Sequence, residues 1–102
     1  MSATFTLSEL AQFNGVDPAK PIYLALKGTV YDVTEKRDAY QPGGSYHILA
    51  GKDASRALAV RSLKAEDCTS DLTGVTDAQL EALNNWVKFY NDKYPKVGTV
   101  SA

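Results

Sequence analysis

The sequence is short of the residues that bind metals and form cross-links, because its 102 residues include only one cysteine, Cys68, and one histidine, His47. A single cysteine cannot form a disulfide within the chain. Structural zinc normally takes four cysteine or histidine ligands, so a zinc site is excluded. A Ser-His-Asp or Cys-His catalytic arrangement would have to use His47, and nothing fixes a nucleophile beside it. The sequence therefore gives little support to hydrolytic catalysis.

The chain also lacks an excess of either charge and any long apolar run. Its 11 basic and 12 acidic residues give a formal net charge of −1, so nothing in the charge balance indicates nucleic acid or an anionic membrane as a partner. No apolar run approaches the roughly 20 residues of a membrane span. The first ten residues, MSATFTLSEL, lack the charged and apolar regions of a secretion signal. We expect no transmembrane segment in this chain and no secretion.

The sequence pattern of the first third of the chain predicts a short helix followed by a β-hairpin. Thr6 and Glu9 match a capping box, which predicts a helix over residues 7–13. Two runs rich in β-branched and aromatic residues then flank Lys27-Gly28, and they predict a hairpin from Ile22 to Val33.

The middle of the chain predicts short helices joined by turns. We expect Thr34 to cap a helical turn that runs to residue 40. Further short helices are predicted over residues 46–50 and from Asp53, a good N-cap, through residues 54–63. The polar, aperiodic segment 64–74 is typical of a surface loop.

The last third carries the strongest helical pattern. Thr76 and Gln79 match a second capping box, and apolar residues follow at helical spacing until Tyr94, which precedes Pro95. Residues 96–100 are expected to form a short strand. The whole pattern predicts one α+β domain over residues 1–102.

Tyrosines are the most conspicuous polar residues. Tyr40 and Tyr46 bracket a Pro-Gly-Gly turn, while Tyr90 and Tyr94 end the long helix beside Lys93. Tyrosines suit half-buried positions, with the ring inside and the hydroxyl outside, so ordinary packing explains each of them alone. Composition and periodicity lead only to a small α+β domain with a pocket.

Three long segments carry a more specific signal: FTLSELAQFNGVDPAKPIYLALKGTVYDVT, YQPGGSYHILAGKDASRAL and LTGVTDAQLEALNNWVKFYNDKYPKVGTV. In this order they resemble the cytochrome b5-like haem/steroid-binding domain, and specifically its membrane-associated progesterone receptor branch. The resemblance implies a cytochrome b5-like fold, with a small mixed sheet and short helices that form a haem cleft. In electron-transferring cytochromes b5 a histidine precedes Pro-Gly-Gly and a second follows later. Gln41 stands at the first position here and no histidine follows His47, so bis-histidine ligation is impossible within one chain.

The resemblance implies haem b as cofactor and assigns four residues to it. Tyr46 corresponds to the axial ligand of the iron, and Tyr40, Lys93 and Tyr94 correspond to residues that hydrogen-bond around the haem and its propionates. Tyrosine is an established proximal haem ligand. His47 is an alternative as a competing or distal ligand, but adjacent side chains on a helix point about 100° apart. Tyr46 and His47 therefore cannot both aim at the iron.

Six apolar or aromatic residues are candidates for the walls of the cleft, and ordinary core packing explains each of them equally well: Leu49, Ala50, Leu58, Leu63, Val87 and Tyr90.

By resemblance, the expected function is that of a haem-binding protein rather than an enzyme, with five-coordinate ferric haem ligated by tyrosinate. Haem-thiolate monooxygenases of sterol and drug metabolism are the implied partners, and haem-dependent homodimers are expected because an exposed haem face is a large apolar patch. The expected location is the cytoplasm or the periphery of the endoplasmic reticulum membrane. The alternatives are a module that binds a steroid or another apolar ligand without haem, and a low-potential electron carrier.

Overall fold

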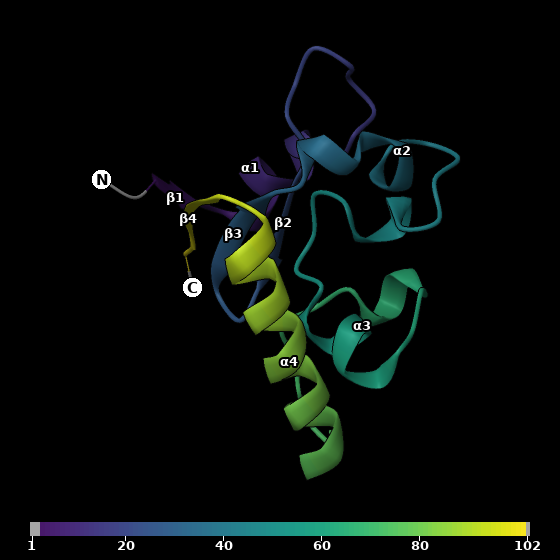
Figure 1. The fold of residues 1–102 in the computed structure, drawn as a ribbon, viewed down its shortest axis with the longest axis vertical. Helices are drawn as coiled ribbons and strands as arrows, with labels where there is room; N and C mark the ends of the chain where they lie inside the picture. The colour runs from purple at the N-terminus through teal and green to yellow at the C-terminus, as the bar shows by residue number, and fades with distance from the viewer. Residues whose placement is uncertain (1–2, 102) are drawn as a thin grey trace.

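A four-stranded mixed sheet organises the fold in the computed structural model, which describes residues 3–101 (Figure 1). The strands are β1 (Ala3–Phe5), β2 (Tyr23–Leu26), β3 (Thr29–Asp32) and β4 (Lys96–Val100), in the order β1-β4-β3-β2. β1 and β4 are parallel, and the other two pairs are antiparallel. β1 was not expected from the sequence, because three residues are too few to show an alternating pattern.

The predicted hairpin is confirmed in β2 and β3. Leu26 pairs with Thr29 across a two-residue loop, in which Lys27 and Gly28 have φ angles of 49° and 85°. Two successive positive φ angles define the turn type whose twist matches that of paired strands, and glycine adopts it without strain.

Short helices and one long helix surround the sheet. They are α1 (Leu7–Leu10), η1 (Ala11–Phe13), η2 (Thr34–Lys36), α2 (Arg37–Tyr40), η3 (His47–Leu49), α3 (Ser55–Val60), η4 (Ala65–Asp67) and α4 (Asp77–Lys93), where η denotes a 3₁₀ helix. Both capping boxes are confirmed. The hydroxyls of Thr6 and Thr76 each accept a hydrogen bond of 3.1 Å from the backbone of Glu9 and Gln79, whose side chains reach back at 2.9 Å.

Two cap predictions were wrong. Thr34 does not cap a helix, because its hydroxyl accepts a hydrogen bond of 3.0 Å from the backbone of Ile22 and so ties η2 to the start of the hairpin. Asp53 lies one residue too early to be the N-cap of α3, although its buried carboxylate accepts a hydrogen bond of 2.9 Å from Ser55. α3 also ends at Val60, before residue 63, because Arg61 adopts a left-handed φ of 57°.

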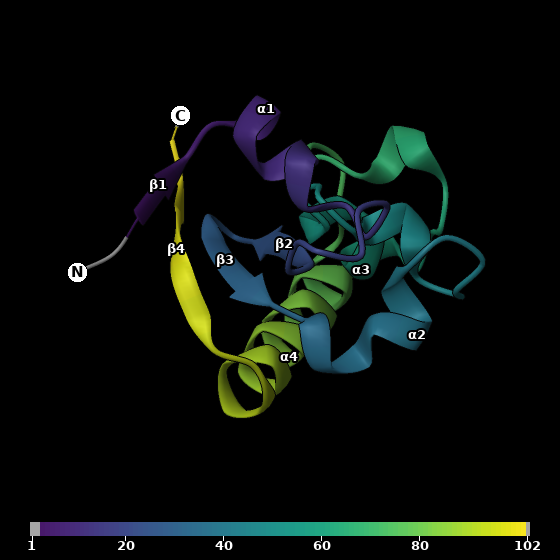
Figure 2. The ribbon, with the colours of Figure 1, turned by 90° about the horizontal axis from the view of Figure 1, so that it is seen from above.

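The two faces of the sheet support separate cores. Ile22, Leu24 and Leu26 lie in the larger core, as their alternation predicted, together with residues of α3 and α4. Ala25 and Val30 point to the other face and pack with Leu10 of α1. Figure 2 shows α1 and α4 on opposite sides of β2 and β3. The larger core lies on the side of the sheet on which the candidate site is built.

Candidate functional site

A cavity of about 470 Å³ lies between the short helices and α4. Its lining is mostly aromatic and aliphatic, with two lysines: Lys36, Ala39, Tyr40, Tyr46, Leu49, Leu58, Trp86, Phe89, Tyr90, Lys93 and Tyr94. This size lies within the range of about 300–1,000 Å³ that is usual for small-molecule sites. All four predicted site residues are therefore brought to one cavity.

The Pro-Gly-Gly turn places Tyr46 beside Tyr40. The backbone N–H of Tyr46 donates a hydrogen bond of 2.8 Å to the carbonyl of Ala39. This close return of the chain requires glycine at position 44, because a Cβ there would lie 2.3 Å from the same carbonyl oxygen. The rings of Tyr40 and Tyr46 consequently lie 5.9 Å apart, measured between centroids.

α4 supplies the opposite wall through residues spaced for one helical face. Tyr90 and Tyr94 are four residues apart, so their rings lie side by side with centroids 5.1 Å apart. The hydroxyls of Tyr90 and Tyr40 share a buried hydrogen bond of 2.7 Å, which joins α4 to α2 across the cavity. The ammonium of Lys93 lies 5.9 Å from the centroid of the Tyr94 ring.

The tyrosines of the cavity differ in their electrostatic surroundings. Burial, and next the neighbouring Tyr90, raises the pKa of Tyr40 far above its usual value, while burial raises the pKa of Tyr90 to about 12. Burial and the charge of Glu35 also raise the pKa of Tyr94. These three hydroxyls remain protonated at neutral pH and can donate hydrogen bonds. Tyr46 is the most exposed of the four, since 43% of its surface is accessible, and its hydroxyl makes no hydrogen bond within residues 3–101.

His47 does not line the cavity, although it is next to Tyr46 in the sequence. It begins η3 and is half-buried. Of the predicted wall residues, Leu49, Leu58 and Tyr90 line the cavity. The remaining three do not: Ala50 is buried in the core, Val87 packs against that core, and Leu63 is 53% exposed.

Sequence reasoning missed four lining residues: Lys36, Ala39, Trp86 and Phe89. One signal was available, because Trp86 and Phe89 precede Tyr90 and Lys93 at the spacing i, i+3, i+4 and i+7, which defines one face of a helix. The two residues on the other wall gave no such signal. Their position depends on how η2 and α2 fold back against α4.

The donor set fits a flat, largely apolar ligand with anionic groups. Aromatic and aliphatic side chains would contact its faces, lysines and protonated tyrosines would bind its anionic groups, and Tyr46 could supply a hard oxygen ligand to a ferric ion. Within residues 3–101 no cluster of three or more histidine, cysteine or acidic residues could hold a metal by itself. Fold and cavity together define a small ligand-binding domain, in which a mixed sheet supports an aromatic cleft closed by short helices.

Comparison with known proteins identifies the family. The chain belongs to the cytochrome b5-like haem/steroid-binding domains, and the model of that family matches residues 6–101. Membrane steroid-binding protein 1 of Oryza sativa subsp. japonica is 51% identical over 92 residues, which are 90% of this chain and 40% of that protein. The probable steroid-binding protein 3 of Arabidopsis thaliana is 48% identical over 94% of this chain and 96% of its own length. The chain thus spans less than half of the rice protein.

A solved structure gives the same result. An Arabidopsis thaliana protein, described as having a cytochrome b5 like fold, superposes with a TM-score of 0.89 at 46% identity, over 99% of this chain and 93% of its own. The predictions of the family, of its membrane-associated progesterone receptor branch and of the fold are confirmed. Among the helices of residues 3–101, none has both the length and the apolar character of a membrane span.

Proposed function

We propose that the cavity binds haem b, with the phenolate oxygen of Tyr46 as the single protein ligand of a ferric iron. The observation that carries the proposal is the contrast among the tyrosines of the cavity. Tyr40, Tyr90 and Tyr94 are buried, whereas Tyr46 lines the same cavity with 43% of its surface exposed. The Tyr46 hydroxyl has no hydrogen-bond partner within the described chain, whereas those of Tyr40 and Tyr90 bond to each other. When bound, haem would supply a ferric centre, which a hard anionic oxygen ligand favours over the ferrous state.

The other residues of the cavity would bind and orient the ligand. Lys93 offers an ammonium to a propionate carboxylate, and the protonated hydroxyl of Tyr94 offers a hydrogen bond. Tyr40, whose hydroxyl is fixed by Tyr90, would hold the Tyr46 side chain through ring contact. Trp86 and Phe89 would exclude water from one face. None of these roles requires a turnover of substrate, so we propose a binding protein rather than an enzyme.

The second candidate is a steroid site without haem. The names of the plant relatives favour it, because they describe steroid-binding proteins. The aromatic lining would accept a steroid body, but a neutral ligand would leave the charges of the two lysines uncompensated. A low-potential electron carrier ranks below both, since one anionic ligand and an open opposite side favour slow redox behaviour.

We further propose that the haem form acts on partner proteins at the periphery of the endoplasmic reticulum membrane. Haem-thiolate monooxygenases of sterol metabolism are the proposed partners, and haem faces that remain exposed would pair two copies of the chain. Sedimentation velocity with and without hemin tests the pairing. A monomer in both conditions would contradict it.

Titration of the purified protein with hemin tests the ligand assignment. We expect a Soret band with a ferric high-spin, tyrosinate-type charge-transfer band, and we expect Tyr46→Phe to lose most of both. Tyr23→Phe is a matched control, because Tyr23 is half-buried on the other face of the sheet. Loss of the bands in His47→Ala but not in Tyr46→Phe would overturn the assignment. Saturable progesterone binding without any hemin spectrum would favour the steroid site.

A further inference from the structure

Lys36 gives the cavity a second cation, to which the roles proposed above assign no particular group of the ligand. It lines the cavity from η2, whereas Lys93 lines it from the last turn of α4. The backbone at Lys36 is fixed, because its N–H donates a hydrogen bond of 2.9 Å to the carbonyl of Val33. No acidic residue lines the cavity, and the only ion pair within residues 3–101 joins Arg56 to Asp67. Neither lysine is therefore paired within the described chain.

The segments that carry the two lysines are joined by a backbone hydrogen bond. The backbone N–H of Asp32, two residues before η2, donates a hydrogen bond of 3.0 Å to the carbonyl of Pro95, two residues after Lys93. The charge of Glu35, the neighbour of Lys36, also acts on the hydroxyl of Tyr94. The hydrogen bond joins the segment just before η2 to the residue just after Tyr94, and Figure 2 shows η2 beside the C-terminal end of α4.

The cavity is apolar toward α3. Leu58 contributes to this side from α3, and α3 packs against the first turns of α4, where Val60 and Ala82 share a second, smaller cavity. Figure 1 shows α3 lower along α4 than the C-terminal turn that carries Lys93. The cavity is thus polarised, because the segments that carry its two lysines meet near the C-terminal end of α4, whereas Leu58 lines it from α3.

We propose that Lys36 and Lys93 together select a flat ligand that carries two carboxylates on one edge, and that Lys36 is the specificity-determining residue for the second carboxylate. This inference rests on the proposed haem function and deepens it, because it favours a dianionic tetrapyrrole over a neutral steroid. A neutral ligand offers the ammonium groups only carbonyl or hydroxyl oxygens, which are weaker acceptors than a carboxylate. A carboxylate without a cation would lose part of its binding free energy to desolvation at the edge of an apolar cavity.

Trp86 makes the test direct, because it is the single tryptophan of the chain and lines the cavity. Quenching of its fluorescence reports occupancy of the cavity for any ligand, with or without iron. The ligands are hemin, iron-free protoporphyrin IX, the neutral dimethyl ester of protoporphyrin IX, and progesterone. Protoporphyrin IX and its dimethyl ester contain no iron and need no axial ligand. Comparing these two therefore separates the effect of the carboxylates from that of Tyr46.

We expect protoporphyrin IX to bind more tightly than its dimethyl ester. Because salt screens the charges, 0.5 M salt should reduce the difference in affinity between the two porphyrins. Lys36→Gln should weaken binding of the free acid about twofold to fivefold, the range for an exposed ion pair, and leave the ester unchanged. Lys36→Arg should restore the preference for the acid. Lys96→Gln is the matched control, because Lys96 is exposed on β4 and does not line the cavity.

Equal weakening of acid and ester in Lys36→Gln, or no effect on either, would overturn the inference. If hemin gives a Tyr46-dependent Soret band while Lys36→Gln changes nothing, the inference fails and the proposed function stands. If the preference for the acid depends on Lys36 but no Tyr46-dependent band appears, the role of Lys36 stands and the ligation by Tyr46 fails. Quenching by progesterone but by neither porphyrin would overturn both.

Discussion

The hydrogen bond between Tyr40 and Tyr90 makes two buried hydroxyls depend on each other. Both rings are almost fully buried, and their hydroxyls lie 2.7 Å apart. Removal of one hydroxyl leaves the other desolvated without a partner, which costs about 1–3 kcal/mol, whereas removal of both can be nearly neutral. We therefore expect Tyr40→Phe and Tyr90→Phe each to lower the free energy of unfolding by that amount, and the double variant to lose less than the sum.

Urea denaturation of the ligand-free protein measures this coupling. Tyr23→Phe serves as control, because it removes a tyrosine hydroxyl from the other face of the sheet. Single variants as stable as the native chain, or a double variant that loses the full sum, would contradict the expectation.

The same pair predicts a loss of stability at alkaline pH. The pKa of Tyr90 is about 12 in the folded protein and close to the ordinary 10 in the unfolded chain. The unfolded state therefore gives up its proton first, so this stabilisation is complete below pH 10 and is lost as the pH rises toward 12. For Tyr90 alone we expect a loss on the order of 2 kcal/mol by pH 12, since each pKa unit corresponds to about 1.4 kcal/mol, and Tyr40, whose pKa is raised further, adds to it. Urea denaturation at pH 8–12 measures it, and the double phenylalanine variant should lose much less over that range.

The individual residues of the candidate site were predicted from the resemblance to a family, and residue chemistry alone would not have identified them. Resemblance singled out Tyr40, Tyr46, Lys93 and Tyr94, and the structure brings them to one cavity. Lys36 could not be found in the same way. An isolated lysine in a polar segment is ordinary, and its place at the cavity follows from the contact of η2 with the end of α4.

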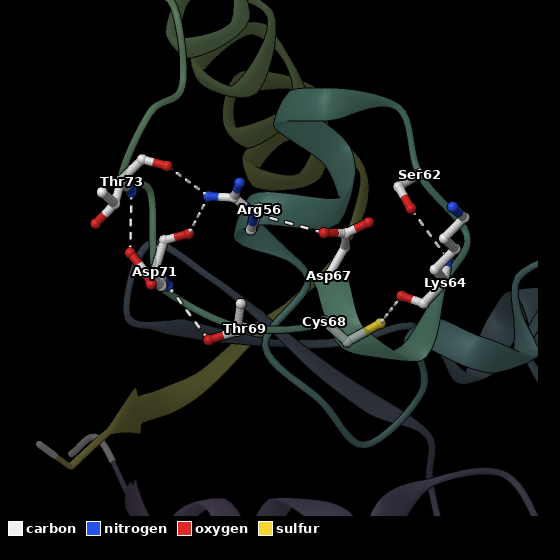
Figure 3. A network of polar contacts seen from close by, with 8 residues as sticks. All are labelled: Arg56, Ser62, Lys64, Asp67, Cys68, Thr69, Asp71 and Thr73. Carbon is white, nitrogen blue, oxygen red and sulfur yellow. Dashed lines mark hydrogen bonds and ion pairs between the residues drawn. The ribbon is translucent and has the colours of Figure 1, made fainter.

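At the scale of elements, Arg56 holds the loop between α3 and α4. Its Nη1 donates hydrogen bonds of 3.0 Å and 2.8 Å to the carbonyls of Asp71 and Thr73, and its Nε lies 3.5 Å from the carboxylate of Asp67 (Figure 3). Cys68 lies in the same loop and donates a hydrogen bond to the carbonyl of Ile48. The loop is therefore fastened to the domain by one planar, many-donor side chain.

We expect Arg56→Ala to loosen this loop and to make Cys68 reactive. Burial raises the pKa of the Cys68 thiol, so exposure should lower that pKa and increase the thiolate fraction at neutral pH. The rate at which a maleimide labels Cys68 should rise several-fold in Arg56→Ala. Arg56→Lys should give an intermediate rate, because lysine keeps the charge but not the several N–H donors of the planar guanidinium. Lys88→Ala, an exposed change on α4, should match the native rate. An unchanged rate in Arg56→Ala would contradict this role.

Elements with local signals were predicted and those with only distant partners were not. The hairpin and both capping boxes depend on residues within a few positions of one another, so their patterns can be recognised in the sequence. β1 exists because Ala3, Thr4 and Phe5 pair with the last strand. Thr34 bonds to Ile22, twelve positions away, instead of capping its own helix. In each case a partner distant in the sequence decides the local structure.

For the whole molecule, ligand binding should appear as added thermal stability. A ligand at one hundred times its Kd adds about 2.7 kcal/mol to the free energy of unfolding. For a domain of this size that corresponds to a rise of about 10–20 °C in Tm. We expect such a rise when hemin is added to the native protein and a much smaller one in Tyr46→Phe. Differential scanning calorimetry measures both. An equal rise in the two proteins would contradict a role for Tyr46 in holding the cofactor.

The parallel pairing of β1 with β4 also bears on how the chain reaches its native state. The first and the last strands of the described chain are neighbours, so this pairing closes the longest loop available to the fold, and such distant contacts form slowly. α4, which provides one wall of the cavity, directly precedes β4. During synthesis on the ribosome, the sheet and the cavity are therefore both completed only after nearly all the described residues have emerged. The ligand therefore meets both walls of its site only near the end of synthesis.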